Sequence, residues 1–583
     1  MKAIKHTPAK NRSLVVILSV SGIVFLLVFL HVRNSQMVLN QTLAEPCESV
    51  SMPVFSVPEG IYDNPFELEI FAPDGYTILY TTDGSTPTIT SKRYKRPINV
   101  DPQVNLNKKI LNIPTTTTLW WKPPVGTQNH STVIRARCFK KGTGYGKVRN
   151  VIYSNSTIRQ HGDFQVVHIL IEADSLFHPA RGIYVLGEEY YSKRGRVEFE
   201  EKIPKNAPIF NDEMWWWSVA PANYHLRGIE WTRPAAFILL DKSGKTSFEQ
   251  NITIRIHGRW SRAFNHKSLR ITSDSFFHHS FFDDLPYQTF KHILLRNSGQ
   301  DLKLSLFRDA MLQELVRKCG VINLDLQAFA PSVVYINGVY WGIHNIRERQ
   351  EEDYLSIKYG SSMEKISIVE YKRNHYMLRF GDDQALQSFE ELIHYINENP
   401  LFNKEKAYQH VSSQIDIDNF IDYMIVQTYF ANEDWADNNA RLYRIDAQTE
   451  IMKQQNIEAG KWRWFLLDLD LSMYSSSFNT FDYLKDVLTN DFFTPLFFGL
   501  MENPEFKEKF LSRYEYIIEI CFCIEKFVQH IEAFEELYES EIEKQVARWH
   551  RPQSVQAWRR YVNDLKVFAR ERHDFVREQL KNL

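Results

Sequence analysis

Hydrophobic and polar residues alternate in several stretches of the chain, which is the pattern of β-strands with one buried face. Residues 164–172 alternate in this way, and the isoleucines at every second position of 252–256 share one face of another predicted strand. Residues 333–346 are predicted to form a β-hairpin, because Asn337-Gly338 at its centre suits the two positive-φ positions of a type I′ turn. The middle of the chain is therefore expected to contain a sheet.

Apolar residues recur at helical spacing in the C-terminal half. Residues 417–428 carry one apolar stripe with a period of 3.6, and Asp416 or Asp418 is the expected N-cap. The pattern remains helical from about residue 504, and a last helix is predicted to start near Ser554. The predicted buried face of that last helix carries Trp558, Val562, Leu565, Phe568, Ala569, Phe575 and Val576.

Residues 53–155 show a different pattern, with short β-rich runs separated by proline and glycine. Turn signals such as Asp74-Gly75 and Asp83-Gly84 recur between the runs. This stretch is predicted to be an all-β sandwich of about 100 residues.

Residues 14–32 form an apolar run that is long enough to cross a bilayer as a helix of about 30 Å. Basic residues precede it, so residues 1–13 are expected to be a cytoplasmic tail and the bulk of the chain to be extracytoplasmic. Residues 33–52 are then a polar stalk. The alternative is a cleaved signal peptide, but the run exceeds the usual apolar region of about 7–15 residues.

Composition narrows the classes of function. A net charge of −2 argues against a nucleic-acid-binding protein, because phosphate binding requires a basic surface. The five cysteines suggest neither a disulfide framework nor a zinc site. Trp215-Trp216-Trp217 suits stacking on sugars or a membrane interface, and core filling at a domain junction is the equally weighted alternative.

Four polar residues in 426–474 are the best candidates for chemistry. Residues 464–471 alternate like a strand, which places Asp468 and Asp470 on one face. Two neighbouring carboxylates are costly to bury unless a cation or a hydrogen-bond donor pairs with them, and Mg²⁺ is the usual partner of such a pair. Upstream, Asp434 and Asn439 have the Asp-x-x-x-x-Asn spacing of the protein-kinase catalytic loop.

Two resemblances add to this interpretation. The run YTTDGSTPT at 80–88, followed by the Ile-Arg-Ala run at 134–136, resembles the chitobiase/β-hexosaminidase C-terminal domain family. That resemblance implies a fibronectin-III-like accessory module, associated with carbohydrate or serving as a spacer. The insertion at about 101–128 departs from the compact pattern of that family.

The larger part of the chain, 160–583, resembles the CotH family of atypical kinases, which are related to a spore-coat protein. The resemblance implies a degenerate kinase-like fold that uses ATP with Mg²⁺ or Mn²⁺ to phosphorylate protein Ser/Thr. It rests on five stretches in order: IRIHGRWSRAFNHKSLRI (254–271), LLRNSGQDLKLSLFRDAM (294–311), 333–355, 415–444 and WRWFLLDLDLSM (462–473).

Position in the CotH pattern implies a role for each candidate residue. Lys267 is implied as the lysine that holds the α/β-phosphates, and Glu348 as its ion-pair partner across the sheet. Asp434 is implied as the catalytic base, and Asn439 as a ligand of the second metal. From their own chemistry, Gly258, Ser261 and Arg262 are candidates to bind phosphate through a backbone N–H, a hydroxyl and a guanidinium, and an ordinary strand-end charge is the alternative for Arg262.

Asp470 takes the place of the metal-binding aspartate, and Asp468 is either a second metal ligand or a partner of Lys267. The sequence departs from the pattern at two points. Asp470-Leu471-Ser472 lacks the glycine of a movable hinge. Trp435-Ala436-Asp437 stands in place of Trp-Pro-Gly and adds a carboxylate near the site.

The expected fold class is thus α+β: an atypical kinase-like domain with a helical C-terminal part, preceded by a small all-β sandwich and one transmembrane helix. The expected function is phosphorylation of a surface or coat protein. The alternative is a non-catalytic surface protein that binds cell-wall polysaccharide or partner proteins. A two-carboxylate glycosidase is less favoured, because Asp468 and Asp470 point the same way and do not flank a substrate.

Overall fold

The computed structural model describes residues 51–583 except 118–119, 193–220, 373–374, 400–404 and 488–491. The predicted transmembrane helix 14–32, the cytoplasmic tail, nearly all of the stalk and the Trp215–Trp217 cluster lie outside these residues. Within them, no helix has both the length and the apolar character that a membrane crossing requires.

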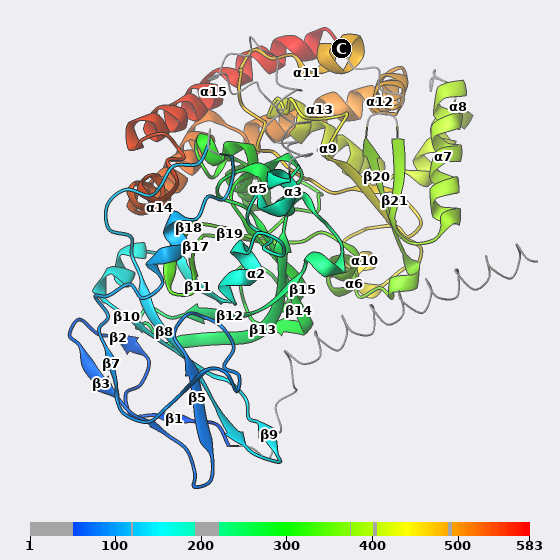
Figure 1. Ribbon diagram of the computed structural model, residues 1–583. Helices are drawn as coiled ribbons and strands as arrows, with labels where there is room; N and C mark the ends of the chain where they lie inside the picture. The colour runs from blue at the N-terminus through cyan, green and yellow to red at the C-terminus, as the bar shows by residue number, and fades with distance from the viewer. Residues whose placement is uncertain (1–50, 118–119, 193–220, 373–374, 400–404, 488–491) are drawn as a thin grey trace, which may run out of the picture.

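Residues 53–155, called the β-module below, are all-β as predicted (Figure 1). One sheet has the order β2-β10-β8-β5-β6, with β9 paired to β8, and two-stranded sheets β1-β4 and β3-β7 accompany it. Apolar residues of β3 and β7 pack against those of β8 and β10 in one small core. The strands are β1 (Val54–Phe55), β2 (Gly60–Ile61), β3 (Phe66–Leu68), β4 (Ile70–Phe71), β5 (Thr77–Thr81), β6 (Lys92–Arg93), β7 (Ile98–Val100), β8 (Ser131–Lys140), β9 (Gly144–Tyr145) and β10 (Arg149–Ser154).

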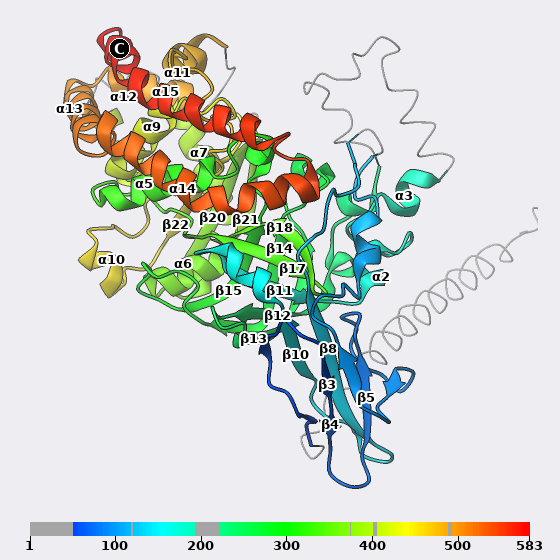
Figure 2. The same ribbon diagram turned by 90° about the vertical axis from the view of Figure 1, so that its left-hand side faces the viewer.

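The β-module shares its core with the rest of the chain. Strand β8 has a nearly continuous run of buried residues, because its two faces pack against different parts of the molecule. Ile134 lies in the small core of the β-module, whereas the neighbouring Val133 lies in the large core of the following domain. Figure 2 shows this sheet directly below the larger one. The β-module is therefore packed on the large domain, which a spacer alone would not require.

The large domain is built on a nine-stranded sheet with the order β16-β19-β15-β14-β13-β12-β11-β17-β18. The predicted strands at 164–172 and 252–256 are confirmed as β11 and part of β13, and Ile252, Ile254 and Ile256 are all buried. The strands are β11 (Gln165–Leu170), β12 (Arg233–Leu240), β13 (Thr246–Ile256), β14 (Leu269–His278), β15 (Thr289–Arg296), β16 (Phe329–Ala330), β17 (Ser332–Ile336), β18 (Val339–Ile343) and β19 (Asn345–Glu348).

The predicted hairpin is confirmed as β17 and β18. Asn337 and Gly338 have φ values of 51° and 82°, as a type I′ turn requires. The side chain of Asn337 also bonds the backbone of Ile171 in both directions, at 2.9 and 2.7 Å. The turn is therefore fixed to the end of β11 as well as to its own strands.

A four-stranded sheet and a set of helices complete the domain. The sheet has the order β21-β20-β22-β23, and Figure 1 shows α7 and α8 beside it. Its strands are β20 (Ile366–Lys372), β21 (His375–Phe380), β22 (Ala440–Ile445) and β23 (Arg463–Trp464). The helices are α2 (Ala173–Phe177), α3 (Gly187–Tyr191), α5 (Arg308–Cys319), α6 (Glu352–Tyr359), α7 (Asp383–Glu398), α8 (Glu405–Gln414), α9 (Ile417–Tyr429), α10 (Glu450–Gln454), α11 (Thr480–Asp482), α12 (Phe493–Met501), α13 (Pro504–Ile520), α14 (Ile524–Trp549) and α15 (Val555–Lys581).

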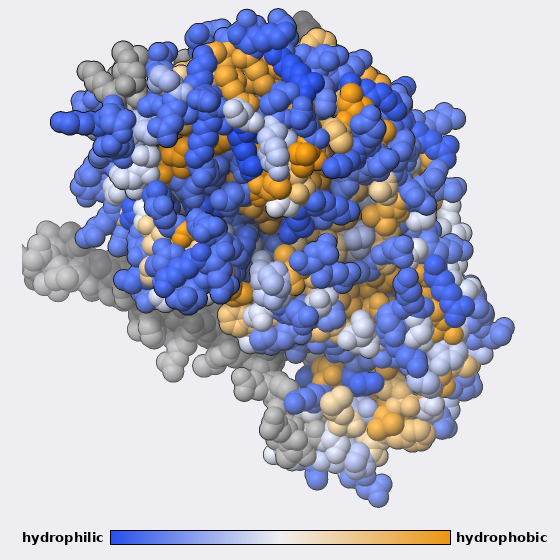
Figure 3. Space-filling model, turned by 180° about the vertical axis from the view of Figure 1, so that it is seen from behind, coloured by the Kyte–Doolittle hydropathy of each residue, from blue (hydrophilic) through white to orange (hydrophobic). Residues whose placement is uncertain are grey.

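The two helices predicted in detail are present. Helix α9 is capped by Asp416, whose carboxylate accepts the backbone N–H of Asn419 at 3.1 Å. Helix α15 is capped by Ser554, but its buried row passes through Arg572 and Val576 and leaves Phe575 42% exposed, so the prediction for Phe575 was wrong. On the face seen in Figure 3, hydrophilic side chains cover most of the surface and apolar ones are interspersed among them.

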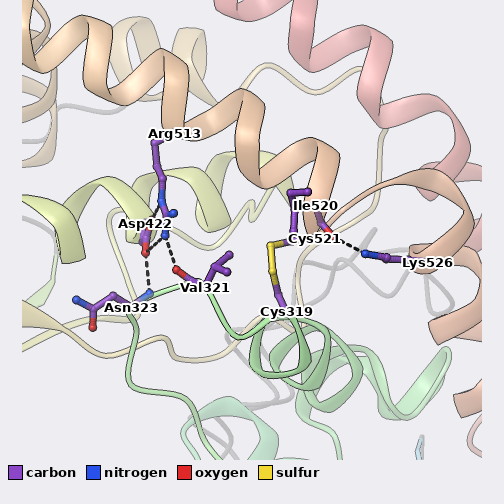
Figure 4. Close-up of a disulfide and its surroundings, with 8 residues drawn as sticks. All are labelled: Cys319, Val321, Asn323, Asp422, Arg513, Ile520, Cys521 and Lys526. Carbon is purple, nitrogen blue, oxygen red and sulfur yellow. Dashed lines mark hydrogen bonds and ion pairs between the residues drawn. A yellow bond between two sulfur atoms is a disulfide. The ribbon is translucent and has the colours of Figure 1, made fainter. Parts of the chain in front are cut away.

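A disulfide joins Cys319 at the end of α5 to Cys521 at the end of α13, which the cysteine pattern did not suggest (Figure 4). An ion pair lies beside it: Arg513 of α13 donates to both carboxylate oxygens of Asp422 on α9, at 2.8 and 2.9 Å. The same region is thus held by one covalent bond and one bidentate ion pair, although its partners are far apart in the sequence.

We expect Cys319→Ser to lower the free energy of unfolding by about 2–5 kcal/mol, because the bond closes a long loop in the unfolded chain. Urea unfolding with and without reductant measures this effect. Cys523→Ser is the matched control, since Cys523 is a free cysteine close to Cys521. Equal stability of the Cys319→Ser variant and the wild type under oxidising conditions would contradict the prediction.

Candidate functional site

Two loops bring the predicted polar residues together. The loop after α9 and the loop after β23 run side by side, because the N–H of Glu433 donates to the carbonyl of Leu471 at 3.2 Å and the N–H of Met473 to the carbonyl of Phe430 at 2.9 Å. Asp434 and Asp470 each adjoin one of these bonded residues. The structure therefore brings the two predicted aspartate regions onto neighbouring segments.

The carboxylate of Asp434 is oriented by the two asparagines that follow it. Asn438 donates to Asp434 Oδ1 at 3.0 Å, and Asn439 donates to Asp434 Oδ2 at 2.9 Å. Asn439 has a φ of 58°, a backbone conformation in which asparagine is one of the tolerated residues. The Asp-x-x-x-x-Asn spacing thus forms a direct contact in this structure.

Asp468 and Asp470 lie close together, but not because they share one face of a strand, as the alternation predicted. The expected strand over 464–471 is wrong beyond its start, since β23 ends at Trp464 and Asp468 has a φ of 52°. The two carboxylates instead converge on the guanidinium of Arg296, at the end of β15. Arg296 Nη2 donates to Asp468 Oδ1 and lies 3.4 Å from Asp470 Oδ2. Asp468 thus pairs with Arg296, and not with Lys267.

Arg296 is the central charge of a partly buried ionic cluster. Its Nε also lies 3.9 Å from Asp309 Oδ2, and Asp309 is paired with Arg347 at 2.6 Å. Burial alone would lower the pKa of Arg296, but Asp468, Asp309 and Asp470 raise it above its usual value. Burial, followed by the charge of Asp468, raises the pKa of Asp470 well above its usual value. The region around Asp470 therefore favours an additional cation.

The neighbouring residues Arg308 and Asp309 each pair with a different part of the chain. Arg308 lies with its Nε 3.4 Å from Asp301, while Asp309 accepts the N–H of Leu469 at 2.9 Å and pairs with Arg347. Asp309 therefore supports the loop that carries the two aspartates.

Gly299 lies so close to Asp470 that a residue with a Cβ would not fit at this position. It has a φ of 60°, and a Cβ at this position would lie 1.9 Å from Asp470 Oδ2. That same oxygen accepts the backbone N–H of Gln300 at 2.8 Å. The turn at Gly299 thus delivers a backbone donor to the carboxylate.

Lys267 and Glu348 do not form the predicted pair. Lys267 is fully buried, and its Nζ donates to the carbonyls of Arg262 and Phe264 at 2.8 and 2.5 Å. Glu348 accepts the hydroxyl of Tyr287 at 2.6 Å and the N–H of Ala328 at 3.1 Å.

The strand register explains why they are apart. The carbonyl of Lys267 accepts a hydrogen bond from His344 Nε2 at 3.1 Å, so Lys267 lies beside the start of β19. Glu348 is four residues farther along, or roughly 13 Å at about 3.3 Å per residue. Burial, followed by the charge of Arg262, lowers the pKa of Lys267 well below its usual value.

The residues that the sequence predicts to bind phosphate lie in the loop between β13 and β14. Gly258 has a φ of 102°, and a Cβ there would meet Ser261 Oγ at 2.3 Å. Arg262 is buried and donates to the carbonyls of Tyr224, Ile256 and Leu226. The guanidinium of Arg262 therefore holds the loop.

A cation at this site would depend on few protein ligands. Over the described ranges, no three His, Cys, Asp or Glu side chains are grouped as a metal site. The oxygens Asp468 Oδ2 and Asp470 Oδ1 accept no hydrogen bond from any described residue. One or two carboxylates supplemented by phosphate oxygens and water are a usual Mg²⁺ environment. The chemistry of Asp468, Asp470 and the amide oxygen of Asn439 therefore fits a hard cation.

Sequence reasoning missed Arg296 and Gly299. Both lie in the stretch LLRNSGQ that supported the resemblance, but a lone arginine at a strand end and a lone glycine carry no specific signal. Their importance depends on which carboxylates the fold brings to them.

We expect Gly299→Ala to displace Asp470. Gly320→Ala is the matched control, because Gly320 has a φ of 75° and a Cβ there would meet nothing within 4 Å. The control should cost about 1 kcal/mol of unfolding free energy, and Gly299→Ala a further 1–3 kcal/mol from overpacking. Urea unfolding measures the difference, and equal losses in both variants would contradict the expected clash.

Comparison with known protein families agrees with both resemblances. The family model described as CotH kinase protein matches residues 254–576, which is more than half of the chain. The model described as chitobiase/beta-hexosaminidase C-terminal domain matches residues 57–112 of the β-module. A comparison with curated proteins finds no match. The chain therefore belongs to the CotH kinase family and carries a chitobiase/β-hexosaminidase C-terminal-like domain in front of its CotH domain.

Proposed function

We propose that this protein transfers the γ-phosphate of ATP to Ser/Thr hydroxyls of a protein substrate, with Mg²⁺ or Mn²⁺. The observation that carries the proposal is the pairing of the two loops. It places Asp434, oriented by Asn438 and Asn439, on the segment that is bonded to the loop of Asp470. Phosphoryl transfer depends mainly on such positioning and on charge neutralisation.

In this mechanism Asp434 orients the acceptor hydroxyl and takes its proton at a carboxylate oxygen. The amides of Asn438 and Asn439 fix the direction of that carboxylate. Asp468, Asp470 and Asn439 would hold the divalent cation, which neutralises phosphate charge when bound. Arg296 keeps the two aspartates side by side, and Gly258 and Ser261 offer the backbone and hydroxyl contacts of the loop.

We propose that the CotH domain works in an extracytoplasmic, oxidising compartment and is anchored through residues 14–32. The Cys319–Cys521 disulfide supports this location, because such bonds persist mainly outside the cytosol. The substrate would then be a surface or coat protein, and the β-module would contact wall polysaccharide or other glycans.

A non-catalytic interaction protein on the same scaffold is the second candidate. Two observations favour it: Lys267 is fully buried on backbone carbonyls, and Arg296 already neutralises part of the charge of Asp468 and Asp470. Under this alternative the ionic cluster stabilises the fold and binds no nucleotide.

We expect Asp434→Asn to lower kcat of phosphate transfer by about 10²–10⁴-fold, the usual contribution of a positioned acid or base. Binding of ATP should be retained, because the change removes the proton acceptor and not the cation ligands. Transfer from labelled ATP to acceptor protein, measured with the full chain and Mn²⁺ or Mg²⁺, gives kcat.

We expect Asp470→Asn to abolish cation-dependent ATP binding as measured by titration calorimetry. Asp274→Asn is the control for a lost carboxylate, because Asp274 is exposed on β14. Folded wild-type protein that binds no ATP with either cation would rule out the kinase and favour the interaction protein.

We expect a glycan at Asn251 and none at Asn155 when the chain passes through a eukaryotic secretory pathway. Both asparagines stand in Asn-x-Ser/Thr sequons, but Asn251 is exposed on β13, whereas Asn155 is 4% exposed and its amide donates to Pro102. Peptide mass spectrometry before and after glycosidase treatment reads out both sites. Occupancy at Asn155 would contradict the structure.

A further inference from the structure

Four consecutive backbone carbonyls of the loop between β13 and β14 are each held by a side chain. Lys267 Nζ binds the first and third, which belong to Arg262 and Phe264. The second and fourth are held by hydroxyls: Thr116 Oγ1 donates to Ala263 at 2.6 Å and Thr115 Oγ1 donates to Asn265 at 2.7 Å. One lysine and two threonines therefore fix the path of this loop, together with the guanidinium of Arg262.

The two threonines come from the β-module. They belong to the insertion at about 101–128, which departs from the compact pattern of that domain family. Asn107 at its start donates to the carbonyl of Asn337 at 2.7 Å, and Val125 at its end donates to the carbonyl of Ala547 at 2.9 Å. Figures 1 and 2 show this blue-to-cyan segment leaving the β-module and running along the large domain.

The hydroxyls of both threonines are directed at carbonyls of the loop. Thr115 and Thr116 are each 0% exposed, so their hydroxyls have no access to water as an alternative partner. Thr117 is also buried, at 4% exposed, but its hydroxyl has no hydrogen-bond partner in the described part of the chain. Only the two hydroxyls that reach the loop are therefore satisfied.

The loop forms a wall beside the candidate cation site. Phe264 and Asn265 line a small hollow of about 50 Å³ together with Trp120 of the insertion and Gln300. Gln300 is the residue whose N–H binds Asp470. A change in the path of the loop would therefore change the space next to the aspartate that we assign to the cation.

We infer that Thr115 and Thr116 are positioning residues of the nucleotide site, so that the β-module is a working part of the CotH domain's ATP site. This inference rests on the proposed function. The two hydroxyls hold the loop that carries Gly258 and Ser261 in the arrangement that accepts ATP. Without them two buried carbonyls lose their partners, and the loop moves to regain hydrogen bonds.

The test compares three variants of the full chain. Thr115→Val with Thr116→Val removes both hydroxyls at nearly constant shape, whereas Thr115→Ser with Thr116→Ser keeps both hydroxyls. Thr117→Val removes a buried hydroxyl that has no hydrogen-bond partner among the described residues.

Because a hydrogen bond of ordinary strength changes an equilibrium by about two- to tenfold, we expect the double valine variant to raise Kd and KM for ATP by about tenfold or more. The KM for the acceptor protein and kcat at saturating ATP should stay near wild type.

The serine pair should keep Kd for ATP within about twofold of wild type, and so should Thr117→Val. Hydrogen exchange of the amides of 257–268 without nucleotide should accelerate in the double valine variant alone. If the double valine change prevents folding, the single variants Thr115→Val and Thr116→Val give the same comparison.

A folded double valine variant with wild-type ATP affinity would overturn the inference and leave the kinase proposal intact. Equal loss of affinity in Thr117→Val would also overturn it, because the effect would then come from the segment and not from the two bonds. Wild-type protein that binds no ATP would instead overturn the proposed function, and with it the role of the threonines at a nucleotide site.

Discussion

The site depends on one largely buried arginine that holds carboxylates from two segments of the chain. Arg296 joins Asp468 and Asp470 of one loop to Asp309 of α5, and all of these groups are at least partly withdrawn from water. Buried charges are costly unless each has a partner, and removing one member leaves the others uncompensated. The nine-stranded sheet supplies the arginine at the end of β15, and α5 supplies Asp309. The loop after β23 takes the path that brings Asp468 and Asp470 to this arginine. The geometry of the candidate site is thus a consequence of charge pairing between elements.

The second constraint is the shared core of the two domains. The β-module buries one face of β8 in its own core and presents Val133 to the core of the large domain. Its insertion then extends across the large domain and contacts the loop between β13 and β14. A domain that looks like an accessory in the sequence is therefore part of the same folding unit in the structure, and its position is fixed by apolar packing and by hydrogen bonds.

Local patterns predicted local structure well. The hairpin at Asn337-Gly338, the strand at 252–256, the cap Asp416 and the start of the last helix near Ser554 all follow from turn chemistry, period and capping, which depend on neighbouring residues only. The strand predicted over 464–471 was wrong, because alternation continues in the sequence while Asp468 turns the backbone. The Lys267–Glu348 pair and the role of Arg296 depend on strand register, and the Cys319–Cys521 bond depends on which helix ends meet. None of these long-range relations is visible in a single sequence.

The disulfide has a consequence for the integrity of the molecule after backbone cleavage. It joins positions 202 residues apart, and Glu348, Asp434, Asn439, Asp468 and Asp470 all lie between them. A protease that cuts one exposed loop in this interval would leave two fragments still covalently joined and still packed in one core. A nicked molecule in an oxidising environment would therefore keep its aspartate loops in place, and only reduction would allow the fragments to separate.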